Sequence, residues 1–136
     1  MRHHFASMLL LGCTLPALAQ QSANDIEVLT RYAGTWAVDC VKAGTRVGVD
    51  VKQLTLQSGA SRMATNVPPM AAFSYFGQQQ PPKGFVVALL GDAPSSQLVF
   101  FVMNDAFGPH LTVQADGPTL KQFGKPALAG KFRRCP

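Results

Sequence analysis

The residues with the clearest chemistry in this 136-residue sequence are its three cysteines, Cys13, Cys40 and Cys135. Cys13 lies in a segment with the pattern of a cleaved export leader, so two thiols remain in the mature chain. Exported proteins meet oxidising conditions, in which an even pair of cysteines normally closes. We therefore predict a disulfide between Cys40 and Cys135. It would hold the two ends of the mature chain together, because the Cα atoms of a disulfide lie within about 7 Å of each other.

The leader pattern covers residues 1–19. A positive start is followed by an apolar run over residues 5–18, and Ala17-Leu18-Ala19 supplies the small residues of a cleavage site before Gln20. The run is too short and interrupted to span a bilayer, so no transmembrane segment is expected. The pattern predicts a periplasmic or secreted protein. As an alternative, Leu10-Leu11-Gly12-Cys13 resembles the lipobox of bacterial lipoproteins, in which Cys13 would carry the lipid.

Catalytic chemistry would have to use His110, the one histidine left after the leader. Together with Asp105 or Asp116 and a serine, it has the residue types of a hydrolase triad. The serines available for that role are Ser58, Ser61, Ser74, Ser95 and Ser96. The sequence lacks the G-x-S-x-G motif that marks the nucleophile of many hydrolases. We therefore expect a protein that is not an enzyme, with a small hydrolase using His110 as the alternative.

Other catalytic and cofactor sites lack ligands. One histidine and two paired cysteines cannot supply the roughly four N or S ligands of a tetrahedral zinc site. Glu27 is the only glutamate, so a pair of catalytic carboxylates would need aspartates that fall mainly at turns, where they usually bond to their own backbone. The glycines are isolated turn residues and form no phosphate-binding motif. We expect no metal and no cofactor.

The charge is unevenly distributed along the chain. The sequence has 12 Lys plus Arg against 7 Asp plus Glu, and no acidic residue follows Asp116. The cations beyond that point are Lys121, Lys125, Lys131, Arg133 and Arg134. This basic end is either a solvated strand that discourages edge pairing or a surface that attracts an anionic partner, such as an acidic protein or lipid headgroups. A nucleic-acid partner is not expected, because the exported chain has no aromatic-basic motif.

The elements that position these residues are short. Residues 22–33, within an N-terminal segment 20–33, predict one helix, capped by Ser22 or Asn24 and ended by Gly34. Everything in 34–136 is predicted to be strands and turns, because ten prolines and twelve glycines separate short apolar runs. The expected strands are 35–41, 46–57, 61–67, 70–76, 85–90, 97–103, 110–115, 120–123 and 128–135. A change of phase near Lys52-Gln53 indicates a bulge in the long strand 46–57.

These elements predict an all-β fold. We expect a small antiparallel eight-stranded β-barrel, or a sandwich, with a short N-terminal helix. The disulfide would make the first and last strands neighbours, as in a sheet that closes on itself. The hairpin 85–103 is apolar at almost every position, so both of its faces must be covered. The cover is either the helix and long loops of this chain or a partner or ligand, in which case Phe100 is a binding residue.

The segment from Gly77 to Gly84 is polar and extended, with Gln79, Gln80 and Lys83 between two apolar strands. It is either a plain connector or a plug that inserts into the cleft of a target, and its two prolines would reduce the ordering cost of that insertion.

Gly34-Thr35-Trp36 opens the first strand after the helix, and here the sequence resembles the G-x-W start of lipocalins and avidin-like barrels. The resemblance implies a barrel in which Arg133 or Arg134 of the last strand packs across Trp36, as a cation–π contact. The T-D-Y motif of lipocalins is absent. The size and cysteine layout are also similar to those of small secreted bacterial inhibitors of hydrolases. These resemblances imply a binding role: inhibition or neutralisation of a partner protein such as a hydrolase or toxin, or, alternatively, carriage of a small hydrophobic ligand inside the barrel.

Overall fold

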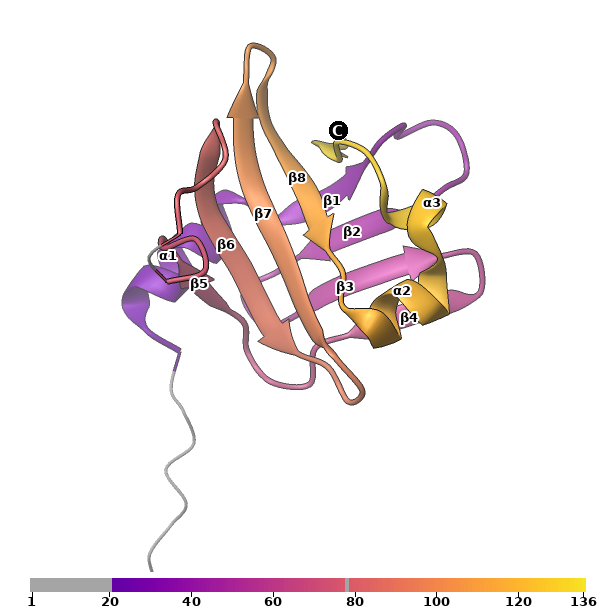
Figure 1. Cartoon of the computed structure of the whole chain (residues 1–136), viewed down its shortest axis with the longest axis horizontal. Helices are drawn as coiled ribbons and strands as arrows, with labels where there is room; N and C mark the ends of the chain where they lie inside the picture. Colours follow the sequence, from indigo (N-terminus) through magenta and orange to yellow (C-terminus); the bar gives the residue numbers. More distant parts are fainter. Residues whose placement is uncertain (1–20, 78) are drawn as a thin grey trace, which may run out of the picture.

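The computed structural model describes residues 21–77 and 79–136, so the predicted leader and Cys13 lie outside the described residues. Within these residues the chain forms two antiparallel sheets that face each other, with helices at their ends (Figure 1). One sheet has the order β4-β3-β2-β1-β9, from β1 (Gly34–Ala37), β2 (Arg46–Val49), β3 (Leu54–Ser58), β4 (Ser61–Ala64) and β9 (Arg133–Arg134). The other has the order β5-β6-β7-β8, from β5 (Met70–Ala72), β6 (Phe85–Asp92), β7 (Gln97–Asp105) and β8 (Gly108–Gln114). The predicted mostly β fold is confirmed.

The sequence left a small eight-stranded barrel or a sandwich open, and the described residues form no closed barrel. The described residues form nine strands in two sheets, which touch at both edges without merging. At one edge a single bridge joins Leu111 of β8 to Phe132, the residue before β9. At the other edge the Asn66 N–H donates to the Asp92 carbonyl over 2.9 Å. Pro68-Pro69 follows after Val67, and because proline has no N–H, β4 and β5 cannot continue into one ladder there.

The phase change near Lys52-Gln53 is a turn, so the predicted bulge in one long strand is wrong. Asp50 and Gln53 exchange backbone hydrogen bonds of 3.0 and 3.3 Å, and the chain reverses between β2 and β3. Val49 then lies opposite Leu54. Both side chains face the other sheet, because paired residues of neighbouring strands point to the same side.

The expected strands 120–123 and 128–135 are also wrong for most of their length. The chain forms helix α2 (Gly117–Phe123) and the short helix α3 (Lys125–Leu128) before β9. The Asp116 carboxylate accepts a hydrogen bond from the Thr119 N–H, and a proline occupies the first turn of α2. Both features start helices, because they satisfy or remove N–H groups that have no partner within the helix.

The predicted N-terminal helix is confirmed as α1 (Ala23–Arg31). Ser22 is its N-cap and forms a capping box with Asp25. The Asp25 carboxylate also accepts the backbone N–H of Ala71 over 2.9 Å, which attaches α1 to the outer edge of β5. Val28 and Leu29 are buried against the core between the sheets. Leu128 of α3 joins the same core from the opposite end, so helices close both ends of the space between the sheets (Figure 1).

Side chains from both sheets fill the core. The largest fully buried ones are Trp36, Phe100, Phe132, Leu29, Leu54, Leu56, Leu89, Leu98 and Leu111. The indole N–H of Trp36 donates to the Tyr32 carbonyl at the end of α1 over 3.0 Å, which satisfies the one polar group of that buried ring.

The apolar hairpin of β6 and β7 is covered on its inner face and over part of its outer face. Its inner side chains enter the core, and Phe101 on its outer face is also buried. Tyr75 and Phe76, from the connection between β5 and β6, lie against Phe101 with ring centroids 5.4 and 5.8 Å away. A loop of the chain itself therefore covers this part of the outer face. This agrees with the first of the two predicted alternatives, cover by the chain's own helix and loops.

Candidate functional site

The predicted disulfide is confirmed: Cys40 and Cys135 are joined, with their Cα atoms 5.5 Å apart. The expected pairing of the first and last strands is confirmed as well, because Trp36 of β1 lies opposite Arg134 of β9. The guanidinium of Arg134 stacks over the Trp36 ring at 4.8 Å and donates to the Arg31 carbonyl at the end of α1. This is the contact that the G-x-W resemblance implied. The contact stabilises the fold and leaves no Trp36 surface for a partner, since Trp36 is fully buried.

Asp105, at the end of β7, organises the basic C-terminal strand. One carboxylate oxygen of Asp105 accepts hydrogen bonds from Arg133 over 2.6 Å and from Lys131 over 2.9 Å. The other oxygen accepts the backbone N–H of Phe107 over 2.8 Å. The hydrogen bonds from Arg133 and then Lys131 hold the pKa of Asp105 well below its ordinary value, so the group is ionised at neutral pH. Arg133 and Lys131 on Asp105, together with Arg134 on Trp36, make three of the five C-terminal cations that have a partner within the molecule.

The same contacts hold the tip of the β7–β8 hairpin. Ala106 and Phe107 form the turn between Asp105 and Gly108, and Gly108 follows them with a positive φ of 97°, as a glycine does after a type I turn in many hairpins. Arg133 also donates to the Gly108 carbonyl over 3.1 Å. Figure 1 shows this tip extending beyond the rest of the two sheets. The Phe107 side chain is 87% exposed at that tip.

The exposed Phe107 was missed in the sequence analysis. An aromatic residue in a two-residue turn is a usable signal, since turn centres favour Gly, Asn and Asp. The segment Asp105-Ala106-Phe107-Gly108 carries that signal. We name residues 105–108 the hairpin tip.

The structure does not assemble a hydrolase triad around His110. Its Nδ1 lies 3.5 Å from the Asp105 carboxylate and makes no hydrogen bond, and the residue is only 4% exposed. Burial and the nearby charge of Arg133 lower the pKa of His110, so the imidazole is neutral at pH 7. No hydrogen bond among the described residues joins His110 to a serine, and Ser96 instead donates to Asp116, the cap of α2.

The remaining predicted binding residues are dispersed. Gln79, Gln80 and Lys83 are exposed in the connection between β5 and β6. Phe100 is fully buried among the core side chains, so a partner could not reach it without opening the core. No group of three metal-ligating side chains occurs in residues 21–77 and 79–136. None of the helices in that part of the chain is long and apolar enough to cross a membrane.

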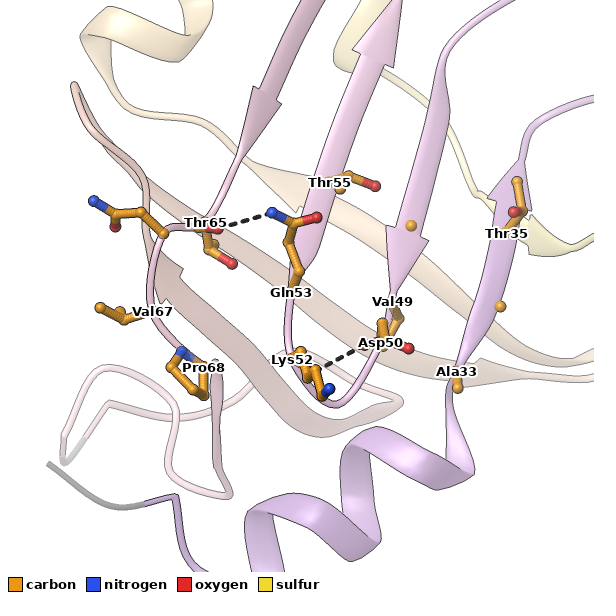
Figure 2. Close-up of a pocket in the computed structure, with 13 residues that line it drawn as sticks. Ala33, Thr35, Val49, Asp50, Lys52, Gln53, Thr55, Thr65, Val67 and Pro68 are labelled. Atoms are coloured by element: carbon orange, nitrogen blue, oxygen red, sulfur yellow. Dashed lines mark hydrogen bonds between the residues drawn. The ribbon is translucent and has the colours of Figure 1, made fainter.

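A groove of about 760 Å³ lies on the outer face of the first sheet (Figure 2). Thr35, Gly48 and Thr55 cross its floor on three neighbouring strands, and Gly48 leaves the space that the Thr55 side chain occupies. Its rim includes Gln53, whose amide donates to the Thr65 carbonyl over 3.1 Å. The groove is open to solvent, and its lining mixes the hydroxyl and amide side chains with the apolar Val67 and Pro68 and the charged Asp50 and Lys52.

Comparison with protein-family models, with curated proteins and with solved structures finds no match for this chain.

Proposed function

We propose that this protein is exported to the periplasm or the cell exterior and there binds a partner protein, such as a hydrolase or a toxin, by inserting the hairpin tip into a cleft of that partner. The observation that carries the proposal is Phe107, a large aromatic side chain that is almost fully exposed at a protruding turn. Aromatic side chains supply much of the binding energy in protein interfaces, and they act best when they fill a pocket of the partner.

The geometry of the tip supports this role because its conformation is fixed before any partner arrives. Asp105 bonds the turn on one side and the last strand on the other, and Arg133 bonds both Asp105 and the carbonyl of Gly108. The disulfide holds the C-terminal residues beside β1. A rigid loop loses little conformational entropy on binding, so more of its contact energy appears as affinity.

The alternative, carriage of a hydrophobic ligand, has less support. A carrier needs an apolar cavity of about 300 Å³ or more between the sheets. Here Trp36, Phe100 and Phe132 meet in that space with leucines from both sheets, and two sets of helices close its ends. A ligand would have to displace these side chains. The groove of Figure 2 lies on the outer face of a sheet and is open to solvent, so it does not enclose a ligand between the sheets.

The test is a photo-crosslinking experiment on the exported protein in its host. A benzophenone amino acid replaces Phe107 in one variant and Phe73, an exposed phenylalanine on another surface, in the matched control. We expect crosslinks to one protein from position 107 and none to that protein from position 73. With the partner in hand, Phe107→Ala should weaken its binding at least about tenfold, as loss of a central aromatic anchor does.

Two results would overturn the proposal. One is equal crosslinking from both positions. The other is a Phe107→Ala variant that binds the captured partner, or inhibits it if it is a hydrolase, as well as the native protein does. Release of a bound lipid on denaturation of the native protein would instead favour the carrier.

A further inference from the structure

A second loop protrudes at the same end of the molecule as the hairpin tip. Residues 38–45 join β1 to β2, and we name them the disulfide loop because Cys40 lies within them. Figure 1 shows this loop and the hairpin tip at one end of the molecule, with the C-terminal residues between them. The Val41 side chain of the disulfide loop is 94% exposed, more than Phe107. Each of the two loops thus presents an apolar side chain to solvent.

Two consecutive residues near the C-terminus connect the disulfide loop to the hairpin tip. A Cβ atom added at Gly130 would lie 3.0 Å from Cγ2 of Val38, so the backbone of Gly130 lies against the disulfide loop. The next residue, Lys131, donates to the Asp105 carboxylate of the hairpin tip over 2.9 Å. The two loops therefore flank one continuous surface. We name it the tip face, formed by residues 38–46, 105–108 and 130–133.

The disulfide loop is held in one conformation by its own polar groups. The Asp39 carboxylate accepts the backbone N–H groups of Val41 and Lys42 over 2.9 and 3.2 Å. Arg46, the first residue of β2, donates to the Lys42 carbonyl over 2.7 Å. The disulfide of Cys40 fixes the loop to the C-terminal end of the chain. Like the hairpin tip, this loop would lose little conformational entropy on binding.

The hairpin tip alone is too small for a specific complex. Stable protein–protein interfaces bury about 800 Å² on each partner and involve about 20–30 residues, whereas the tip consists of residues 105–108. A partner that receives Phe107 must therefore also contact surface beside the tip. The disulfide loop supplies such surface, because it is continuous with the tip, apolar and exposed at Val41, and already ordered.

The tip face has more positive than negative charges. Its cations are Lys42, Arg46, Lys131 and Arg133, and its acids are Asp39 and Asp105. Both carboxylates are already bonded within the molecule, Asp39 to backbone N–H groups and Asp105 to Arg133 and Lys131. Lys42 is exposed, and no salt bridge within residues 21–77 and 79–136 includes it. This surface therefore favours a partner whose contacting side chains are acidic.

We propose that the disulfide loop is a second contact site for the partner protein bound by the hairpin tip, and that this partner presents acidic side chains to Lys42. The inference rests on the function proposed above and specifies the chemistry of the partner: a cleft that receives Phe107, with carboxylates at its edge. Val41 contacts the partner beside that cleft. Lys42 speeds association by electrostatic attraction, which salt screens because the charge is exposed.

The first test extends the crosslinking experiment to the disulfide loop. The benzophenone amino acid replaces Val41 in one variant of the exported protein, Phe107 in a second, and Phe73, on another surface, in the control. We expect positions 41 and 107 to crosslink to the same protein and position 73 not to. If position 107 captures a protein that position 41 does not, this inference fails and the function proposed for the tip stands. If position 107 captures nothing, the proposed function fails and takes this inference with it.

The second test measures the affinity and association rate of the captured partner. Lys42→Glu reverses a charge on the disulfide loop, and the matched control Lys52→Glu makes the same change in the turn at the opposite end of β2. We expect Lys42→Glu to slow association and weaken binding at least about fivefold in about 50 mM salt, and less in about 500 mM salt. Lys52→Glu should have little effect. Both variants have the same net charge, so a difference between them reports the local contact.

A third variant, Val41→Ser, tests the apolar contact of the disulfide loop. It should weaken binding at least about fivefold at both salt concentrations, because it removes apolar area from the interface. The side chains of Val41 and Lys42 are exposed, so each variant should keep the native circular dichroism spectrum. Native affinity for Val41→Ser would show that the disulfide loop is not a contact site. Native affinity for Lys42→Glu, or equal weakening by Lys42→Glu and Lys52→Glu, would show that the partner presents no acid to Lys42.

Discussion

At the scale of single residues, Asp105 determines how much of the basic C-terminus is available to a partner. The sequence analysis left two interpretations open for that cluster, a solvated strand or an anion-binding surface. The structure shows Arg133 and Lys131 on one carboxylate and Arg134 on Trp36. Cations that already have a partner at hydrogen-bond distance attract an anion less than free ones do, because the new anion must compete with the existing one.

The first prediction concerns the acid sensitivity of this arrangement. The pKa of Asp105 is lower in the folded protein than in the unfolded chain, so its charge stabilises the fold above pH about 4 and that stabilisation is lost as the pH falls through the folded value. We expect Asp105→Asn to lower the free energy of unfolding at pH 7, with the difference from the native protein shrinking below pH 4. Urea unfolding at pH 7, 5 and 3 measures it. The control is Asp92→Asn, and a difference that stays constant with pH would contradict the prediction.

At this scale, structure could be predicted where a residue type has one main use. Two cysteines and a G-x-W start with an arginine near the C-terminus were enough to predict the disulfide and the cation–π contact, although the choice between Arg133 and Arg134 needed the structure. Phe107 was missed because exposure is not a property of a residue type. It depends on where the strands on each side of the turn end relative to the rest of the molecule.

At the scale of elements, the fold is built from short pieces whose ends are fixed by polar caps. The helix α1 was predicted correctly because Ser22 and Asp25 form a local capping signal that precedes a helical apolar pattern. The second half of α2 was mistaken for a strand and most of α3 for a turn, because a segment of four to seven residues shows too little periodicity to identify a helix. The cap at Asp116 followed by Gly117-Pro118 was interpreted as a plain turn, although Pro is also common in the first helical turn.

The second prediction tests the capping of α1. Ser22→Ala removes the oxygen that accepts the Asp25 N–H, and we expect it to lower the free energy of unfolding by about 1 kcal/mol, the usual effect of losing an N-cap. Asn24→Ala, an exposed change within the first turn, is the control and should have little effect. Thermal unfolding followed by circular dichroism measures both. Equal unfolding temperatures for Ser22→Ala and the native protein would show that the cap does not stabilise the fold.

At the scale of the whole molecule, the two sheets are held together at their edges by few contacts. One edge has the bridge between Leu111 and Phe132, and the other has the bond from Asn66 to Asp92. The prediction that the chain ends meet is correct, and of the two architectures that it left open, a closed barrel and a sandwich, the closed barrel is not found. Proximity of the first and last strands does not require every strand between them to pair, and Pro68-Pro69 interrupts the pairing at the far edge.

The third prediction concerns the link between the chain ends. The disulfide encloses a loop with a sequence separation of 95 residues. In the chain-entropy model a loop of that length stabilises the fold by about 4–5 kcal/mol, through restriction of the unfolded chain. We expect Cys40→Ser, Cys135→Ser to lose much of this stability. Urea unfolding of the double variant beside the native protein, with and without reductant, measures the loss. An unchanged midpoint would show that the β1–β9 pairing holds the ends without the covalent bond.

The position of β9 at the end of the chain affects when the fold can be completed. This strand pairs with β1 of one sheet, and Phe132 just before it bridges Leu111 of β8 in the other sheet, so it links the two sheets at one edge. It also follows every other described strand in chain order. A polypeptide that crosses a membrane from its N-terminus delivers this piece after all the others. On the export proposed above, the fold would be complete only after β9 has crossed the membrane, in the compartment where Cys40 and Cys135 are oxidised.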